Sequence, residues 1–149
     1  MTVSWFNSAI RNPSPASDDQ VQKAERELGV RLPADFLAIA KTHQGAMPEP
    51  ECFDLPEGGK GSIKYLLHFE EEPFYSSIAA LREPVNDVLP KKVIPFAEDS
   101  GGNLLCFDYR NSDETPEILF WDHEGNAPFP LQTIASSFTD LITRLRDYD

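Results

Sequence analysis

Residues 93–124 constrain the fold most, because this segment holds two strongly apolar runs separated by polar turns. The runs are residues 104–109 and 118–121, and both are rich in the branched and aromatic residues that pack well on a pleated surface. An acidic turn before the first run contains Gly101 and Gly102, which can adopt positive φ without steric cost. The segment therefore predicts the centre of an antiparallel sheet, which helices elsewhere in the chain must cover.

Two helices are predicted ahead of this sheet. Ser17 begins a capping box, apolar residues follow at helical spacing, and Gly29 ends the first helix. The second helix opens at Leu32 and Pro33, and Gly45 provides a left-handed end. The two helices form an N-terminal hairpin.

Shorter elements are predicted on either side of the central segment. Residues 52–55 and 63–69 have the composition of strands, and residues 76–82 are predicted as a short middle helix that Pro84 stops. A capped C-terminal helix starts at Phe138. The sequence therefore predicts an α+β fold, in which an antiparallel or mixed central sheet of about five to six strands packs against the N-terminal hairpin, the middle helix and the C-terminal helix.

The length of 149 residues matches one domain, and we expect a single domain over residues 1–149 with its core at about 17–147. The cysteines, Cys52 and Cys106, form no C-x-x-C pair, and we expect Cys106 in the core. There is no apolar run long enough to span a membrane, and residues 1–10 lack the pattern of a signal peptide. We therefore expect a cytoplasmic protein that does not bind membranes.

Charge separates the possible classes of partner. The chain has 25 acidic and 13 basic residues, a formal net charge of -12, and no lysine or arginine cluster. Nucleic acid is therefore not expected as a partner, because phosphate binding depends on such clusters. Residues 49–72 hold seven acids against two lysines, a field that would steer a cationic protein toward them. The alternative is that the acidic excess only keeps the surface soluble.

The first candidate contact residues are Glu70, Glu71 and Glu72, which lie just before Phe74 and Tyr75. Charges beside aromatic side chains are typical of interfaces that have a few anchoring residues. The alternative for Phe74 is a place in the core.

A second acidic rim is predicted near the strand ends, where Glu98, Asp99, Asp108, Asp122 and Glu124 would meet if the strands form a meander. Carboxylates at such positions also make ordinary hydrogen bonds within turns, and this alternative stays open for Asp99.

The residues of an enzyme are poorly represented. None of the three histidines has the spacing of a metal site, and Ser100 with His123 lacks the G-x-S-x-G turn that exposes a nucleophile. The glycine-rich residues 58–62 precede a strand, whereas a phosphate loop must precede a helix. We therefore expect no catalytic residue, metal, cofactor or small-molecule substrate.

Several short motifs follow one another along the chain, and their residues are Gly29, Leu32, Pro33, Gly45, Pro95, Gly101, Gly102, Trp121 and Phe138. The order and spacing of these motifs resemble the SUKH superfamily, and within it the group related to the fungal cell-wall assembly regulator. The resemblance spans roughly residues 21–145. One departure is Gln44 before Gly45, where the family usually has asparagine before the glycine.

This resemblance implies a binding protein. Bacterial members are similar to immunity proteins that are encoded beside contact-dependent toxins, often nucleases or deaminases, and that neutralise them by direct contact. The acidic excess agrees with a basic toxin as the partner. We therefore expect an immunity-type protein that binds a basic, nucleic-acid-targeting toxin domain. Two alternatives are a regulatory scaffold or adaptor that binds an endogenous protein, as the fungal relatives suggest, and an unrecognised hydrolase.

Overall fold

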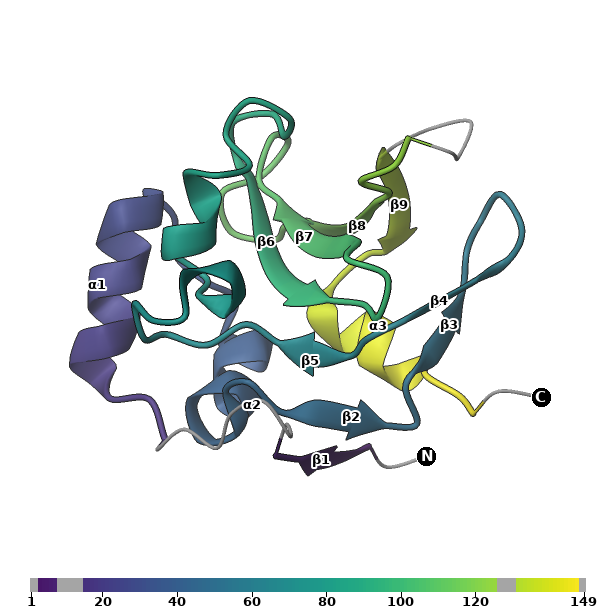
Figure 1. Cartoon of the computed structure of the whole chain (residues 1–149), viewed down its shortest axis with the longest axis horizontal. Helices are drawn as coiled ribbons and strands as arrows, with labels where there is room; N and C mark the ends of the chain where they lie inside the picture. The colour runs from purple at the N-terminus through teal and green to yellow at the C-terminus, as the bar shows by residue number, and fades with distance from the viewer. Residues whose placement is uncertain (1–2, 8–14, 126–130, 148–149) are drawn as a thin grey trace.

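The computed structural model describes residues 3–7, 15–125 and 131–147, and its helices and strands form the predicted α+β fold (Figure 1). In chain order the elements are β1 (Ser4–Phe6), α1 (Asp18–Leu28), α2 (Ala34–His43), β2 (Met47–Glu49), β3 (Cys52–Asp54), β4 (Lys60–Ser62), β5 (Tyr65–Leu66), the 3₁₀ turns η1 (Phe74–Ser76) and η2 (Ala80–Arg82), β6 (Val93–Glu98), β7 (Leu104–Asp108), β8 (Glu117–Trp121), β9 (Leu131–Ala135) and α3 (Phe138–Thr143).

The five strands β5 to β9 form an antiparallel meander in chain order, with the apolar strand β7 at its centre. Every residue of β7 is buried, which confirms the predicted sheet centre and the core position of Cys106. Pro95 lies on the inner strand β6, where the register shifts between Pro95 and Ala97. A bulge at this point interrupts the hydrogen-bond ladder, so the sheet can hold a residue that has no N–H.

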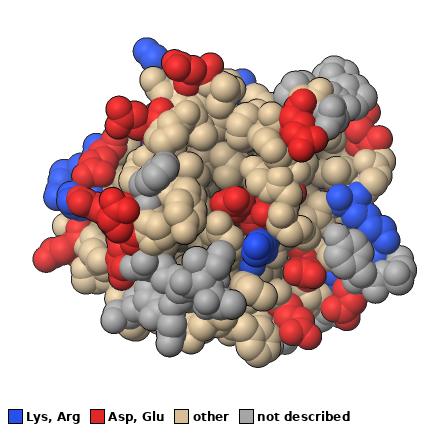
Figure 2. Space-filling view, in the orientation of Figure 1, with Lys and Arg blue, Asp and Glu red and all other residues tan. Residues whose placement is uncertain are grey.

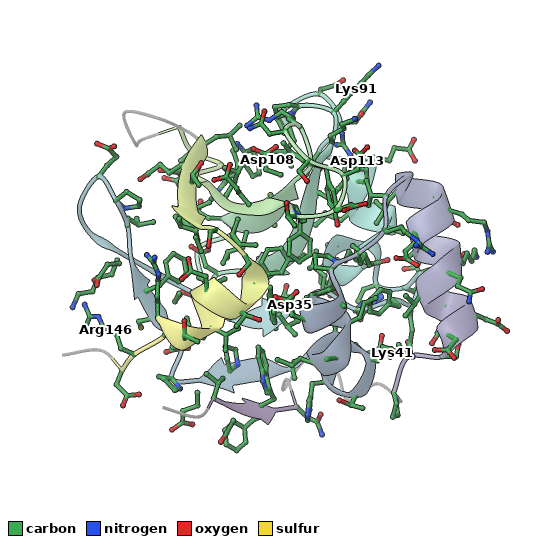
Figure 3. The ribbon with its side chains drawn as sticks, turned by 180° about the vertical axis from the view of Figure 1, so that it is seen from behind. Asp35, Lys41, Lys91, Asp108, Asp113 and Arg146 are labelled. Carbon is green, nitrogen blue, oxygen red and sulfur yellow. The ribbon has the colours of Figure 1, made fainter. Side chains whose placement is uncertain are left out.

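Aromatic rings fix the helices on one face of the sheet. The Phe36 ring of α2 meets the rings of Phe96, Phe107 and Phe138 edge to face, with centroids 5.6, 5.1 and 5.3 Å apart. At the edge of this cluster the Asp35 carboxylate accepts hydrogen bonds from α3, one of them from the Thr139 N–H at 2.9 Å (Figure 3). The cluster therefore binds α2, α3 and the sheet into one core.

The helical hairpin has the predicted ends. Ser17 and Gln20 form a reciprocal capping box, and Gly29 ends α1 with a φ of 73°. Helix α2 begins directly after Pro33, and Gly45 takes the left-handed conformation with a φ of 74°. In Figure 1, α1 lies at the side of the molecule, next to the 3₁₀ turns, while α2 lies closer to the sheet.

The predicted middle helix over residues 76–82 is wrong, because this segment forms the two short turns η1 and η2. Ser77 does act as a cap, since its hydroxyl accepts from the Ala80 N–H at 3.3 Å, but Pro84 leaves no room for a second turn.

The predicted strand over residues 63–69 is also wrong as one element. The chain changes partners here: the Ile63 N–H donates to Glu51 O, and the next N–H, of Lys64, donates to Glu98 O. Within the predicted range only Tyr65–Leu66 forms a strand, β5, and β4, which ends at Ser62 just before this range, belongs to a different sheet.

Strands β1, β2, β4 and β9 were not predicted from the sequence, and β4 lies in the glycine-rich residues that were interpreted as a turn. β1 pairs with β2 and stacks the Trp5 ring on His43 at the end of α2, with centroids 6.5 Å apart. β9 pairs with β8 at the edge of the main sheet. Its alternation of Ile134 with polar Thr133 is a strand signal, although a weak one over five residues.

Candidate functional site

The three consecutive glutamates predicted as contact residues lie in the segment of residues 70–75, here called the acidic loop. This loop and α1 border an open groove of about 490 Å³, here called the α1 groove. Figure 2 shows acidic side chains along the left edge of this face, where α1 lies, with basic side chains among them. The groove is lined by Gln20, Lys23, Ala24, Glu27, Phe69, Glu70, Glu71, Glu72, Ser77, Ala79 and Ala80.

The charge of the α1 groove is strongly negative, because four glutamates face one lysine. The Lys23 ammonium donates to the Glu71 carboxylate, and it lies 3.9 Å from Glu27. The hydrogen bond and the charge of Glu71 raise the pKa of Lys23, and the same hydrogen bond lowers the pKa of Glu71. Both side chains are exposed, so solvent screens this pair and the groove keeps a negative field.

The acidic loop ends with an aromatic residue, Tyr75. Tyr75 is 50% exposed, which is unusual for a large side chain in this molecule. The side chain of Phe74, the other predicted anchor, lies outside the described residues. Glu70, Glu71 and Glu72 line the α1 groove, whereas Tyr75 is not among its lining residues.

Two buried polar side chains hold the start of the acidic loop, and sequence reasoning missed both. The Phe69 N–H donates to Gln44 Oε1 at 2.8 Å, and the next N–H, of Glu70, donates to His68 Nδ1 at 3.1 Å. Gln44 is 3% and His68 is 1% exposed. Gln44 is the residue that departs from the family pattern. This departure was the one feature of the sequence that could have indicated a special role for Gln44.

The second predicted rim lies at the β6–β7 turn and the end of β8, but its carboxylates differ in availability. Asp99 is 8% exposed, and its oxygens accept from the N–H groups of Gly101 and Asn103, both at 2.8 Å, and from the Asn103 side chain. The structure gives this carboxylate the turn role that the sequence left open. We therefore leave Asp99 out of any contact surface.

Glu98 is also engaged, because Tyr65 Oη donates to its carboxylate at 2.8 Å. Burial raises the pKa of Glu98, and the nearby charge of Asp99 raises it further, although the Tyr65 hydrogen bond opposes the shift. Asp122 is half-buried and Glu124 is exposed. The rim thus offers less exposed charge than the α1 groove does.

Asp108, at the end of β7, is 6% exposed and is paired within the chain. Burial alone would raise its pKa, but hydrogen bonds from the Arg110 guanidinium and backbone outweigh burial and lower it. This carboxylate therefore has a structural role at the end of β7 and is not available for a partner.

A larger hollow of about 740 Å³ lies at the other end of α1, around Gly29 and Tyr109, and its charges balance. Glu25, Asp113 and Glu114 face three basic side chains there, and Figure 3 labels Asp113 on this side of the molecule. The three basic residues are Arg26, Arg31 and Lys92. This hollow therefore has the larger volume, but the α1 groove has the excess of negative charge that would attract a basic partner.

The residues considered for catalysis are engaged elsewhere. His123 Nδ1 lies 2.7 Å from Asn103 Oδ1 and its Nε2 lies 3.8 Å from Glu124, so both ring nitrogens face partners other than Ser100. Its ring also lies edge to face with Trp121, with centroids 6.3 Å apart. Among the described residues, no three metal-binding side chains come together. Within the same ranges, no helix is long and apolar enough to cross a membrane.

Comparison with known proteins gives the family of this chain. Residues 15–144 match the model of the SMI1 / KNR4 family (SUKH-1). The chain is also similar to the SPbeta prophage-derived uncharacterized protein YokK of Bacillus subtilis (strain 168), with 31% identity over 160 residues, 93% of this chain and 79% of that protein. The family match spans the α1–α2 hairpin, the five-stranded sheet and α3. The chain belongs to the SMI1 / KNR4 family (SUKH-1).

Proposed function

We propose that this protein is an immunity-type protein that neutralises a cognate toxin domain by binding it through the α1 groove. The SUKH family is associated with immunity or regulatory roles rather than with catalysis, and a prophage-derived relative fits the first of these roles. The toxin is expected to be basic and to act on nucleic acid in the cytoplasm. The protein needs no turnover and no cofactor for this role.

The charge imbalance of the α1 groove is the observation that carries the proposal. Four glutamates and one lysine line the groove, whereas the larger hollow has equal numbers of acids and bases. A toxin that acts on nucleic acid needs a cationic active cleft, and complementary charge speeds the encounter of two such surfaces. The groove is therefore the surface of this chain that fits such a cleft best.

Tyr75 supplies the second requirement of an interface. Binding energy concentrates in a few large side chains, and tyrosine is frequent among them. Tyr75 is half exposed at the end of the acidic loop, so a partner that covers the loop would bury the ring. In this arrangement the glutamates orient the partner and Tyr75 anchors it.

The test is co-expression of this protein with toxin domains encoded beside its gene. The wild-type chain should restore growth and co-purify with one of them. The E70K/E71K/E72K variant should lose protection, and its association rate at low salt should fall at least about tenfold. The matched control is E57K/D87K/E114K, which makes the same change in net charge at exposed residues outside the groove.

Each outcome bears on one part of the proposal. Full protection by E70K/E71K/E72K would reject the α1 groove as the contact surface. Equal loss in both variants would mean that only net charge matters. Capture of an endogenous protein, with no growth effect against any neighbouring toxin, would favour the adaptor role.

A further inference from the structure

His68 is a buried ionisable residue that has no part in the proposed contact, and its ring binds both ends of the acidic loop. It follows β5 and is 1% exposed. Nδ1 lies 3.1 Å from the Glu70 backbone nitrogen, and Nε2 lies 2.9 Å from Ser76 Oγ. Its backbone N–H also donates to Ser76 O at 2.9 Å. His68 thus binds the first residue of the acidic loop, Glu70, and the residue that directly follows the loop, Ser76.

The hydrogen bonds define the protonation state of the His68 ring. A backbone N–H can only donate, so Nδ1 must be the bare nitrogen that accepts from Glu70. The neutral ring then carries its hydrogen on Nε2 and donates it to Ser76 Oγ. The Ser76 hydroxyl can in turn donate to Pro73 O at 3.3 Å, so the donors run in one direction.

Three side chains of the acidic loop are not held in place by burial. Glu71, Glu72 and Tyr75 are all exposed. The polar contacts at the two ends of the loop are buried, and a buried hydrogen bond is costly to leave unmade. The conformation of the loop should therefore depend on these contacts.

We propose that His68, as the neutral Nε2–H tautomer, is the positioning residue of the acidic loop. Nδ1 fixes the direction in which the chain leaves at Glu70, and Nε2–H fixes its return at Ser76. The importance of this residue for a partner rests on the proposed function, but its positioning role is testable in the isolated protein.

The first test is the ¹⁵N spectrum of the His68 ring in the full-length chain near neutral pH. The proposal expects Nδ1 with the shift of an unprotonated nitrogen and Nε2 with that of a protonated one. A ring with the hydrogen on Nδ1, or with both nitrogens protonated, would overturn the proposal. Assignment by comparison with His68→Gln separates this ring from His43 and His123.

The second test uses two variants that each keep half of the ring's chemistry. His68→Asn places an acceptor near the position of Nδ1, whereas His68→Gln places a donor near the position of Nε2. The Glu70 amide should exchange its hydrogen about tenfold faster in His68→Gln than in His68→Asn. The Leu105 amide, at the sheet centre, serves as the internal reference for global stability.

The results then divide cleanly. Faster exchange at Glu70 with unchanged exchange at Leu105 in His68→Gln supports the proposal, and equal changes at both amides, or none at Glu70, overturn it. If neither histidine variant folds, Ser76→Ala decides. A shifted Nε2–H resonance, with the hydrogen still on Nε2 because the Glu70 N–H keeps Nδ1 as the acceptor, supports the proposal, and an unchanged Nε2–H resonance overturns it.

Binding of a toxin separates this inference from the proposed function. If His68→Gln loosens the Glu70 amide but binds the toxin normally, the acidic loop is not the contact surface, although His68 still positions it. If the Glu70 amide is unaffected and E70K/E71K/E72K loses binding, the proposed function stands without His68.

Discussion

Glu98 lies where burial and a hydrogen bond act in opposite directions on one carboxyl group. Burial raises its pKa from the ordinary value of 4.5, and the Tyr65 hydrogen bond reverses only part of that shift. A carboxyl group with a raised pKa in the folded state holds its proton longer there than in the unfolded chain. Its contribution to stability is therefore full below pH 4.5 and is lost as the pH rises through the folded-state pKa.

We expect Glu98→Gln to raise the free energy of unfolding at pH 7 by up to about 1 kcal/mol, after allowance for solvent screening of a half-exposed group. Glutamine removes the charge and keeps an oxygen that can accept from Tyr65. Urea unfolding at pH 4.5 and pH 7 measures the difference. A gain of the same size at both pH values would contradict this explanation.

Asp108 should show the opposite dependence on pH. Burial raises its pKa, but the Arg110 hydrogen bonds lower it below the ordinary value of 3.8. The stability that it contributes is therefore present above pH 3.8 and is lost as the pH falls through the folded-state pKa. Asp108→Asn should cost about 1–3 kcal/mol at pH 7 and much less in acid. Chemical unfolding at both pH values checks this, with Ser100→Ala as an exposed control at the opposite end of β7.

The sequence indicated where acidic residues gather, but not which carboxylates stay available. The Asp99 carboxylate accepts a hydrogen bond from Asn103, and the Asp108 carboxylate accepts one from Arg110. Such pairing depends on the detailed geometry of each turn. The positioning role of His68 could not be predicted either, because the neighbouring sequence does not show that both ring nitrogens form hydrogen bonds at the ends of one loop.

The β3–β4 hairpin depends on a glycine that faces an aromatic ring. A Cβ at Gly61 would lie 2.5 Å from Phe53 Cε2, well inside contact distance, and Phe53 is 2% exposed. We expect Gly61→Ala to destabilise the protein by about 1–3 kcal/mol through overpacking. Thermal unfolding measures the loss.

Phe53→Leu in the Gly61→Ala background should recover part of that loss, because the shorter side chain makes room for the methyl group. The matched control is Gly101→Ala, where the nearest atom is 3.6 Å from the added Cβ, and it should have little effect. Additive losses in the double variant would show that the two side chains do not collide.

Elements whose signals are local were predictable. The capping box at Ser17 and the glycine at Gly29 give the limits of α1 through bonds that span only a few residues. The division between β4 and β5 was not predictable in this way, because it depends on two distant partners, Glu51 and Glu98, each accepting from a neighbouring N–H. Long-range pairing of this kind determines where short strands begin and end.

The net charge of the whole molecule should control how fast it meets a basic partner. With a formal charge of -12, long-range attraction adds to the local field of the α1 groove. We expect the association rate with the toxin to fall about tenfold or more between about 0.05 M and 0.5 M salt, while the dissociation rate changes little. Stopped-flow measurements check both rates, and a dissociation rate that rises as steeply would contradict steering.

Each of the chain's two tryptophans lies against a histidine. Trp5 of β1 lies against His43 at the end of α2, and Trp121 lies against His123 at the end of β8. A protonated imidazole quenches a neighbouring indole. The tryptophan fluorescence of this protein thus provides a built-in pair of optical reporters, and Trp5→Phe would leave Trp121 as a single tryptophan that reports on the end of β8 alone.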